Sequence, residues 1–354
     1  MKMKLLLAID SFKGCLSSSE ANAAALEGVL QAKPDAEVVS VPVSDGGEGW
    51  IEAFQAAIGG ETVWADVRDP LMRPIRACYL CKGEQGIIEI AKASGLTLLT
   101  DAERNPLVAT SYGTGQLVAD AVRHGCREII VGLGGSATSD AGRGMLQALQ
   151  DEFGEDLLTL RGITFKIATD VVNPLYGHEG AARVFAPQKG ATLDMVIELD
   201  RSAQAFAEQS AQLHGYDRSS VPGAGAAGGL GYAFMQYLGA ECRSGIELLL
   251  DTIGFDDLLT DASLAITGEG SSDRQTLMGK LPMGILHRAS ANHVPVCLIA
   301  GRIADHRQLL HAGFSHVACI NPPTLPLAVA LRPYVAKENI RNTVATLLEC
   351  NEFV

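Results

Sequence analysis

The sequence is poor in charged and aromatic residues. Of its 354 residues, 19% are Asp, Glu, Lys or Arg and 5% are aromatic, whereas charged residues make up about a quarter of an average globular protein. Acidic residues outnumber basic ones by 41 to 28, and the net charge of -13 excludes a general attraction to nucleic acid or to anionic lipid. An anionic ligand therefore has to be held by local groups: backbone amides, a few Lys and Arg side chains, or a metal ion.

Long apolar runs and paired cysteine motifs are also missing. The N-terminal run Leu5–Ile9 is shorter than the seven or more apolar residues, roughly, of a secretion signal. The uncharged stretch Val221–Ala240 is rich in glycine and contains a proline, which makes it a poor membrane helix. Only Cys78 and Cys81 form a C-x-x-C pair, and no second pair completes a zinc site. We expect a cytoplasmic protein with reduced thiols that binds neither membranes nor nucleic acid.

Apolar residues and glycine, by contrast, are abundant. Apolar residues make up 47% of the chain, and 38 residues are glycine. Such a chain can bury a large core, which excludes a disordered or fibrous protein. Low charge with many glycines predicts a buried α/β sheet with glycine-rich turns, and the length predicts about two domains.

Strand and helix signals alternate at both ends of the chain. The first apolar run is typical of a strand buried on both faces, and Ser17 to Glu20 has the pattern of a helix capping box. This β-α-β-α order favours a parallel sheet. The expected strands are 4–9, 36–43, 263–267, 294–300 and 316–320, and the expected helices are 17–32, 50–57, 284–292 and 337–349.

The middle of the chain has a different pattern. Short strands separated by turn residues are expected over 62–67, 75–80 and 86–90, which favours an antiparallel or mixed sheet. We therefore predict a discontinuous parallel α/β domain formed by residues 1–60 and 262–354. A mixed α/β domain, residues 61–261, is inserted into it.

Four polar loops that contain glycine each follow an apolar strand. Ligands bind at the carboxyl ends of the strands in open parallel sheets, so such loops converge when they belong to one sheet. A single Asp-Gly after a strand is usually only a turn, but the repetition favours a binding site. The loops are Asp10–Gly14, Asp45–Gly49, Gly134–Asp140 and Thr267–Asp273.

Two glycine-rich segments allow more than one interpretation. Gly134–Asp140 leads into a predicted helix near Gly142, where exposed amides and the helix N-terminus suit phosphate. A tight strand-to-helix turn explains this loop equally well, and the P-loop spacing is absent. Gly223–Gly228 matches G-x-G-x-x-G, but no buried strand precedes it. A glycine-rich helix entry that packs against another backbone is favoured there over a dinucleotide site.

Several segments together resemble the bacterial class I glycerate kinases. They keep the family's order and run from residue 10 to about residue 300. The segment 151–167 is shorter than the resemblance leads us to expect. The matching segments are Asp10-Ser-Phe-Lys-Gly14, Ser44-Asp-Gly-Gly-Glu-Gly49, Tyr112-Gly-Thr-Gly115, Gly134-Gly-Ser-Ala-Thr138, Asn173-Pro-Leu175, Pro187-Gln-Lys-Gly-Ala191, Pro222–Gly231, and Thr267-Gly-Glu-Gly270 with Asp273, Gln275-Thr276 and Gly279-Lys280.

The resemblance implies an enzyme that phosphorylates D-glycerate on its 2-hydroxyl with ATP and Mg²⁺, giving 2-phosphoglycerate and ADP. It also implies that the discontinuous domain is flavodoxin-like or Rossmann-like and that the active site lies in the cleft between the two domains. One alternative is a catalytically silent protein that binds small anions on the same scaffold, which the shortened segment permits. Another is a phosphatase or a nicotinamide-dependent hydroxy-acid dehydrogenase. Turnover of ATP with glycerate separates these possibilities.

Phosphoryl transfer needs positioning, neutralisation of charge and a base for the attacking hydroxyl. We expect Asp45 to be the base, Asp10 and Glu269 to be the metal ligands, and Lys13 and Lys280 to contact phosphates. The candidate catalytic residues are Asp45, Lys13, Asp10 and Asp273, and the candidate binding residues are Ser11, Gly46, Gly47, Glu48, Gly134, Gly135, Ser136, Thr138, Asp170, Asn173, Gly268, Gly270, Thr276 and Lys280.

Overall fold

The computed structural model of the chain describes residues 3–155, 157–274 and 276–350. It divides into two compact units. The outer unit consists of Met1–Ser44, Glu52–Ile58 and Ile246–Val354, and the inserted unit consists of Asp45–Ile51 and Gly59–Gly245. Relative to the boundaries expected from the sequence, residues 45–51 lie with the inserted unit and residues 246–261 lie with the outer unit.

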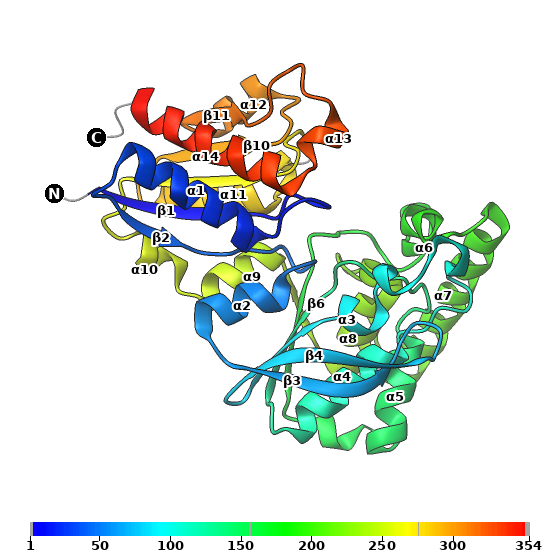
Figure 1. Ribbon diagram of the computed structural model, residues 1–354. Coiled ribbons are helices and arrows are strands. Elements are labelled where there is room, and N and C mark those ends of the chain that lie inside the picture. The colour runs from blue at the N-terminus through cyan, green and yellow to red at the C-terminus, as the bar shows by residue number, and fades with distance from the viewer. Residues whose placement is uncertain (1–2, 156, 275, 351–354) are drawn as a thin grey trace. The chain divides into compact units, whose positions relative to one another are not determined.

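The outer unit contains a five-stranded sheet in which all neighbouring strands are parallel (Figure 1). The strand order is β11-β10-β9-β1-β2. Numbered within this unit, this is the flavodoxin-like order 2-1-3-4-5. The pairing of β1 with β9 confirms that the two ends of the chain build one parallel sheet. The strands are β1 (Lys4–Ile9), β2 (Glu37–Ser40), β9 (Leu264–Glu269), β10 (Val296–Ala300) and β11 (His316–Cys319).

The central strand β1 is buried on both faces, as its apolar run predicted, because Leu5 to Ile9 are all 0% exposed. On one face, α1 (Ser18–Ala32) and α14 (Pro333–Cys350) pack against β1. The predicted capping box is present at the start of α1, where Ser17 and Glu20 exchange hydrogen bonds. The other helices of this unit are α10 (Phe255–Leu259), α11 (Leu281–Ala291), α12 (His306–Ala312) and α13 (Leu327–Ala330). Two further helices, α2 (Trp50–Ile58) and α9 (Gly245–Thr252), have residues in both units.

The inserted unit contains a six-stranded mixed sheet, which confirms the change of pattern in the middle of the sequence. The hairpins β3–β4 and β4–β5 are antiparallel, and β5 to β8 run parallel. The strands are β3 (Glu61–Arg68), β4 (Pro74–Lys82), β5 (Gln85–Glu89), β6 (Glu128–Gly132), β7 (Thr164–Ala168) and β8 (Glu241–Arg243). The helices are α3 (Ala91–Ser94), α4 (Tyr112–Arg123), α5 (Arg143–Phe153), α6 (Ala181–Phe185), α7 (Leu193–His214) and α8 (Leu230–Leu238).

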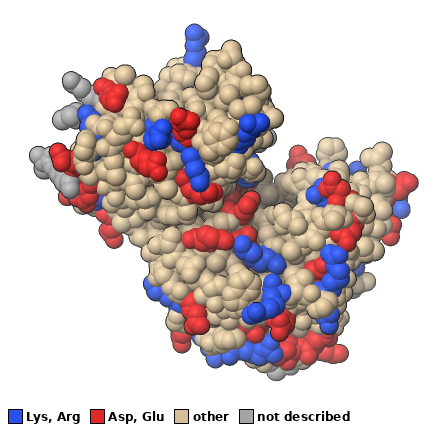
Figure 2. Space-filling view, viewed as in Figure 1, with Lys and Arg blue, Asp and Glu red and all other residues tan. Residues whose placement is uncertain are grey.

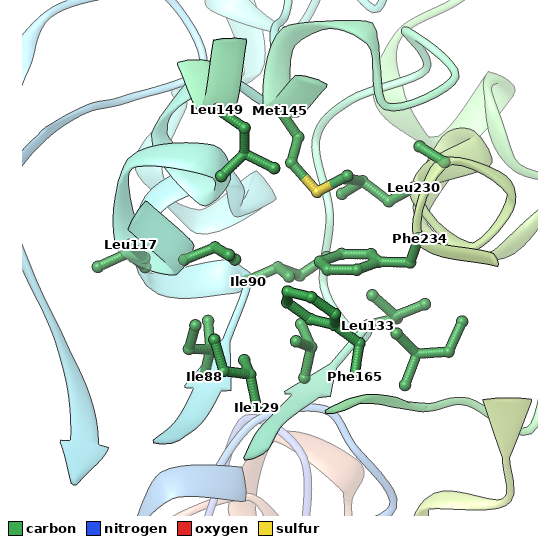
Figure 3. Packing of buried hydrophobic residues seen from close by; sticks show 14 of the residues in the cluster. Ile88, Ile90, Leu117, Ile129, Leu133, Met145, Leu149, Phe165, Leu230 and Phe234 are labelled. Atoms are coloured by element: carbon green, nitrogen blue, oxygen red, sulfur yellow. The ribbon is translucent and has the colours of Figure 1, made fainter. Parts of the chain in front are cut away.

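The core of the inserted unit lies between its sheet and helices α4, α5 and α8 (Figure 3). Phe165 from β7 and Phe234 from α8 meet near its centre, with 6.2 Å between their ring centroids. Ile129 from β6 and Met145 from α5 are completely buried in the same cluster. This packing holds the carboxyl ends of β6 and β7, from which the site loops of this unit leave.

Positive and negative side chains are interspersed on the face drawn in Figure 2, without an extended basic area on that face. No helix in the described part of the chain is long and apolar enough to span a membrane.

Candidate active site

Two acidic loops leave the carboxyl ends of β1 and β9 in the outer unit. Ile9 pairs with Gly268, and the N–H of Asp10 donates to the carbonyl of Gly268 at 2.9 Å. Asp10 and Glu269 therefore stand on neighbouring strands, which are spaced about 4.8 Å apart. The chain passes from β1 to β2 on one side, while β9 lies on the other, so this is the topological switch point where open α/β sheets bind ligands.

Glu269 is held in place through one of its two carboxylate oxygens. The side chain is 7% exposed, and Oε1 accepts hydrogen bonds from Ser272 Oγ at 2.8 Å and from Thr276 Oγ1 at 2.5 Å. Burial raises the pKa of Glu269, while these hydroxyls and the positive charge of Lys280 oppose that rise. The candidate binding residue Thr276 is itself fully buried, so it positions Glu269.

The two candidate lysines of the outer unit lie at different kinds of turn. Lys13 is exposed in the tight turn Phe12–Leu16. The backbone of Gly270 runs beside the backbone of this turn, since a Cβ added to Gly270 would lie 3.7 Å from the backbone nitrogen of Lys13. Lys280 is the N-cap residue of α11, because that helix begins at Leu281, earlier than the sequence predicted. Its side chain makes no capping hydrogen bond, and the helix N-terminus beside it favours an anion.

The remaining candidates of this unit make local backbone contacts. The N–H of Ser11 donates to Asp10 Oδ1 at 2.7 Å, and the N–H of Asp273 donates to Thr276 Oγ1 at 3.1 Å. Gly268 is fixed by the sheet, because a Cβ there would lie 2.4 Å from the carbonyl of Ile299. Gln275 lies outside the described residues.

The carboxylates of the outer unit suit a magnesium ion that is also bound by phosphate and water oxygens. They do not suit a metal ion bound by protein ligands alone. In residues 3–155, 157–274 and 276–350, no group of three or more His, Cys, Asp or Glu side chains could hold a metal ion. Mg²⁺ commonly takes only one or two carboxylates and completes its shell with water and phosphate oxygens. Asp10 and Glu269, on adjacent strand ends, are a donor set of this kind.

In the inserted unit, the loop Asp45–Gly49 packs against the ends of β6 and β7. The N–H of Gly134 donates to the carbonyl of Gly46 at 2.9 Å. Gly46 has φ +99°, and a Cβ there would lie 2.9 Å from the carbonyl of Ala168. A Cβ on Gly134 would lie 2.3 Å from the Cα of Gly47. Glycine is required at these positions because two backbones approach without room for a side chain.

Asp170 lies beyond the carboxyl end of β7 and close to Asp45. The N–H of Gly245 donates to Asp170 Oδ1 at 3.3 Å, and a Cβ on Gly245 would lie 1.9 Å from the Asp45 carbonyl oxygen. Partial desolvation of the carboxyl raises the pKa of Asp170 to about 6, although the residue as a whole is exposed, and the negative charge of Asp45 adds to that rise. Asp45 is therefore close enough to Asp170 for its charge to disfavour ionisation of the Asp170 carboxyl.

The N-terminus of α5, which follows the Gly134–Asp140 loop, is already occupied by a carboxylate of the chain. Asp140 accepts hydrogen bonds from the amides of Gly142 at 3.0 Å and Gly144 at 3.1 Å, and from the amide and hydroxyl of Ser111, both at 2.8 Å. The first amides of this helix are therefore used within the fold. Any anion at this loop has to be bound by the loop itself.

The glycine-rich segment before α8 packs against the backbone of the loop Gly134–Asp140. A Cβ on Gly228 would lie 2.0 Å from the carbonyl of Thr138, and the N–H of Ala141 donates to the Gly228 carbonyl at 3.0 Å. The literal G-x-G-x-x-G match is thus a close backbone contact at a helix entry, which confirms the interpretation favoured from the sequence. Asn173 also has a local partner, since its Nδ2 donates to the carbonyl of Glu179 at 2.8 Å.

Lys189 was absent from the candidate site residues, although it contacts two of them. It is 3% exposed, and its Nζ donates to Ser136 Oγ at 2.9 Å and to the Thr138 carbonyl at 2.5 Å. Its segment, Pro187–Ala191, belongs to the motif series of the resemblance, which was the available signal. Nothing in the sequence pattern indicates that this lysine is buried beneath a loop some fifty positions earlier in the chain.

The fold and the loops define a class: a two-unit α/β enzyme with acidic, glycine-rich loops at the carboxyl ends of its strands. The family model described as the glycerate kinase family matches residues 5–160 and 155–351. The chain belongs to the glycerate kinase family. The resemblance noted in the sequence and the expectation of a kinase enzyme are both confirmed.

Relatives named for this activity align over most of the chain. The chain is 42% identical over 334 residues to the glycerate 2-kinase of Escherichia coli K12, covering 87% of this chain and 88% of that protein. It is 39% identical over 351 residues to the glycerate kinase of Bacillus subtilis 168, covering 92% of each. A crystal structure from Salmonella typhimurium LT2, described provisionally as glycerate kinase 2, superposes with a TM-score of 0.84 at 37% identity and covers 99% of this chain and 98% of that one.

Proposed function

We propose that the protein transfers the γ-phosphoryl group of ATP to the 2-hydroxyl of D-glycerate. The hydroxyl oxygen forms a bond to phosphorus, the bond to the bridging oxygen breaks, ADP leaves, and the hydroxyl proton passes to a base. The observation that carries this proposal is the match to the glycerate kinase family over nearly the whole chain. The acidic loops at the switch point of the outer sheet support it, because such a point is where nucleotides and phosphates bind in this fold type.

The outer unit supplies the groups proposed to handle phosphate. Lys280 stands at the N-terminus of α11, where its ammonium group and the positive end of the helix would act on one anion. Pro282 has no N–H, and the amides of Met283 and Gly284 donate to the Lys280 carbonyl, so the lysine side chain is proposed as the main donor. Lys13 extends from the neighbouring loop and is proposed to neutralise the transferred group. Asp10 and Glu269 would hold Mg²⁺ together with phosphate oxygens. A magnesium ion bound there would neutralise charge on the β- and γ-phosphates and so favour departure of ADP.

The inserted unit supplies the groups proposed to handle glycerate. Asp45 is proposed to accept the proton of the attacking hydroxyl, which contributes on the order of 10²–10⁴ to the rate in general-base catalysis. Asp170 lies beside it and adds a second carboxylate to this part of the site. Gly46 and Gly47 leave the approach to Asp45 free of side-chain atoms. This division of roles is part of the proposal and rests on the cleft that the family resemblance implies.

A coupled assay of ADP release tests the proposal. Purified protein with ATP, Mg²⁺ and D-glycerate is expected to release ADP continuously, and omission of any one component is expected to stop it. Release of ADP without glycerate would identify an ATPase. Stabilisation by glycerate without any turnover would support the silent anion-binding protein instead.

A further inference from the structure

Lys189 is a buried cation that the proposed mechanism does not use. It ends the short turn Pro187–Lys189, and its Nζ contacts the Gly134–Asp140 loop from the protein side through Ser136 and Thr138. Both acceptors are neutral: a hydroxyl and a backbone carbonyl. Within the described ranges of the chain, no carboxylate lies at ion-pair distance from this ammonium group.

A buried ammonium group without a paired anion is costly, so such groups are rare in folded proteins. Burial lowers the pKa of Lys189 to about 8, and the charge of Asp140 opposes that change. Asp140 forms no ion pair with Lys189, and its oxygens accept hydrogen bonds at the start of α5 and from Ser111. The Lys189 ammonium group therefore has no counter-ion at ion-pair distance among the described residues.

The loop Gly134–Asp140, which Lys189 contacts, contains buried hydroxyl groups without a hydrogen-bond partner among the described residues. These groups are Thr138 Oγ1 and Ser139 Oγ. Ser136 Oγ accepts from Lys189, which leaves the serine proton free to donate to another group. A cation that donates to a hydroxyl also strengthens that hydroxyl as a donor. The loop is held from behind by Gly228, so these groups are fixed in place.

We propose that Lys189 is a positioning residue of an oxyanion subsite formed by the loop Gly134–Ser139. Lys189 fixes the loop and polarises the Ser136 hydroxyl. The anion that balances the charge of Lys189 is then the carboxylate of the bound hydroxy acid or a phosphate of the bound nucleotide. The inference rests on the proposed function, since these are the oxyanions of that reaction. A lysine that only tethered the loop would need no charge.

The test is the pair of variants Lys189→Met and Lys166→Met, each compared with the wild type. Lys166 is the control, because it is a half-buried lysine of the same unit that pairs with Glu128 at 2.5 Å and contacts no site loop. Lys189→Met is expected to raise KM for one substrate about tenfold or more. A rise in KM for D-glycerate would show that the subsite binds the carboxylate of the hydroxy acid, and a rise in KM for ATP would show that it binds a phosphate of the nucleotide. The melting temperature does not decide between the two roles, because removing a buried charge stabilises the fold while leaving the Thr138 carbonyl without its donor destabilises it. Lys166→Met is expected to leave both KM values unchanged.

Equilibrium binding separates a failure of this inference from a failure of the proposed function. Calorimetric titration with D-glycerate alone and with ATP alone is expected to show binding to the wild type that Lys189→Met weakens for one ligand. If the wild type binds these ligands but does not turn over, the proposed function fails and the binding result still decides the role of Lys189. Unchanged affinities and KM values in Lys189→Met, with or without a lower melting temperature, would make the lysine a structural tether and overturn the inference.

Discussion

Gly134→Ala is expected to damage catalysis far more than stability. The added Cβ would lie 2.3 Å from the Cα of Gly47, whereas carbon atoms in contact are about 3.8 Å apart. The loop that carries Asp45 therefore has to retreat by about 1.5 Å. Gly134 has no left-handed φ, so this displacement is the main effect of the substitution.

The two consequences differ in size. Forcing a methyl group into a packed contact costs about 1–3 kcal/mol of stability. A displacement of about 1 Å in a catalytic group can cost about 10² in rate. We expect turnover at saturating substrates to fall about 10²-fold, while the protein remains folded by circular dichroism and melts at a moderately lower temperature.

Gly125→Ala is the matched control for this prediction. Gly125 lies in the same unit with φ +91°, and a Cβ added there would have no described atom within 4 Å. Alanine there costs about 1–2 kcal/mol through backbone strain alone, so stability falls while turnover stays near the wild-type value. Wild-type turnover in Gly134→Ala, or an equal loss of turnover in both variants, would refute the claim that this contact positions Asp45.

Three further substitutions test individual groups. Asp45→Asn keeps the shape and removes the basicity, so kcat should fall by about 10²–10⁴ while ATP still binds; a mere rise in the Mg²⁺ requirement would assign Asp45 to the metal instead. Lys280→Ala should weaken ATP binding and slow transfer with an almost unchanged melting temperature, because the side chain makes no capping hydrogen bond; unchanged kinetics would leave it an ordinary surface lysine. Asp170 has a folded pKa raised to about 6, so its contribution to stability is present at pH 3 to 4 and is lost as the pH rises through 6. Asp170→Asn should therefore melt higher than the wild type at pH 8 and match it near pH 4, and the opposite order would show that the ionised carboxylate stabilises the fold.

Much of the fold could be predicted because its signals are local. The run Lys4–Ile9 is apolar throughout after its first residue, and β1 is buried on both faces as such a run predicts. The capping box at Ser17 gave the start of α1 to within one residue. The long helix α7 (Leu193–His214) has equally local signals, with Thr192 as its N-cap and Gly215 after its last turn, and was not predicted. Both ends of α7 are therefore marked by residue types typical of helix caps.

The arrangement of the site could be predicted only in part, because it depends on long-range contacts. The acidic loops after β1 and β9 were expected together, and their strands are neighbours. The assignment of residues 45–51 to the inserted unit rests on contacts of Gly46 with Ala168 and Gly134, which no periodicity reveals. Occupation of the α5 N-terminus by Asp140 and burial of Lys189 likewise depend on tertiary packing. Sequence patterns indicate where polar loops occur. Tertiary contacts between backbones decide which amides and side chains of these loops remain available to a ligand.

Phosphorus NMR of a complete reaction mixture tests the central claim most directly. With the protein, ATP, Mg²⁺ and D-glycerate, the account predicts the signals of ADP and one new phosphomonoester. That signal should be a doublet, because a phosphate on the 2-hydroxyl couples to the single hydrogen on its carbon. A triplet would place the phosphate on the 3-hydroxyl and contradict the proposed product. Inorganic phosphate alone, or unchanged ATP, would contradict the assignment of a glycerate-phosphorylating activity to this chain.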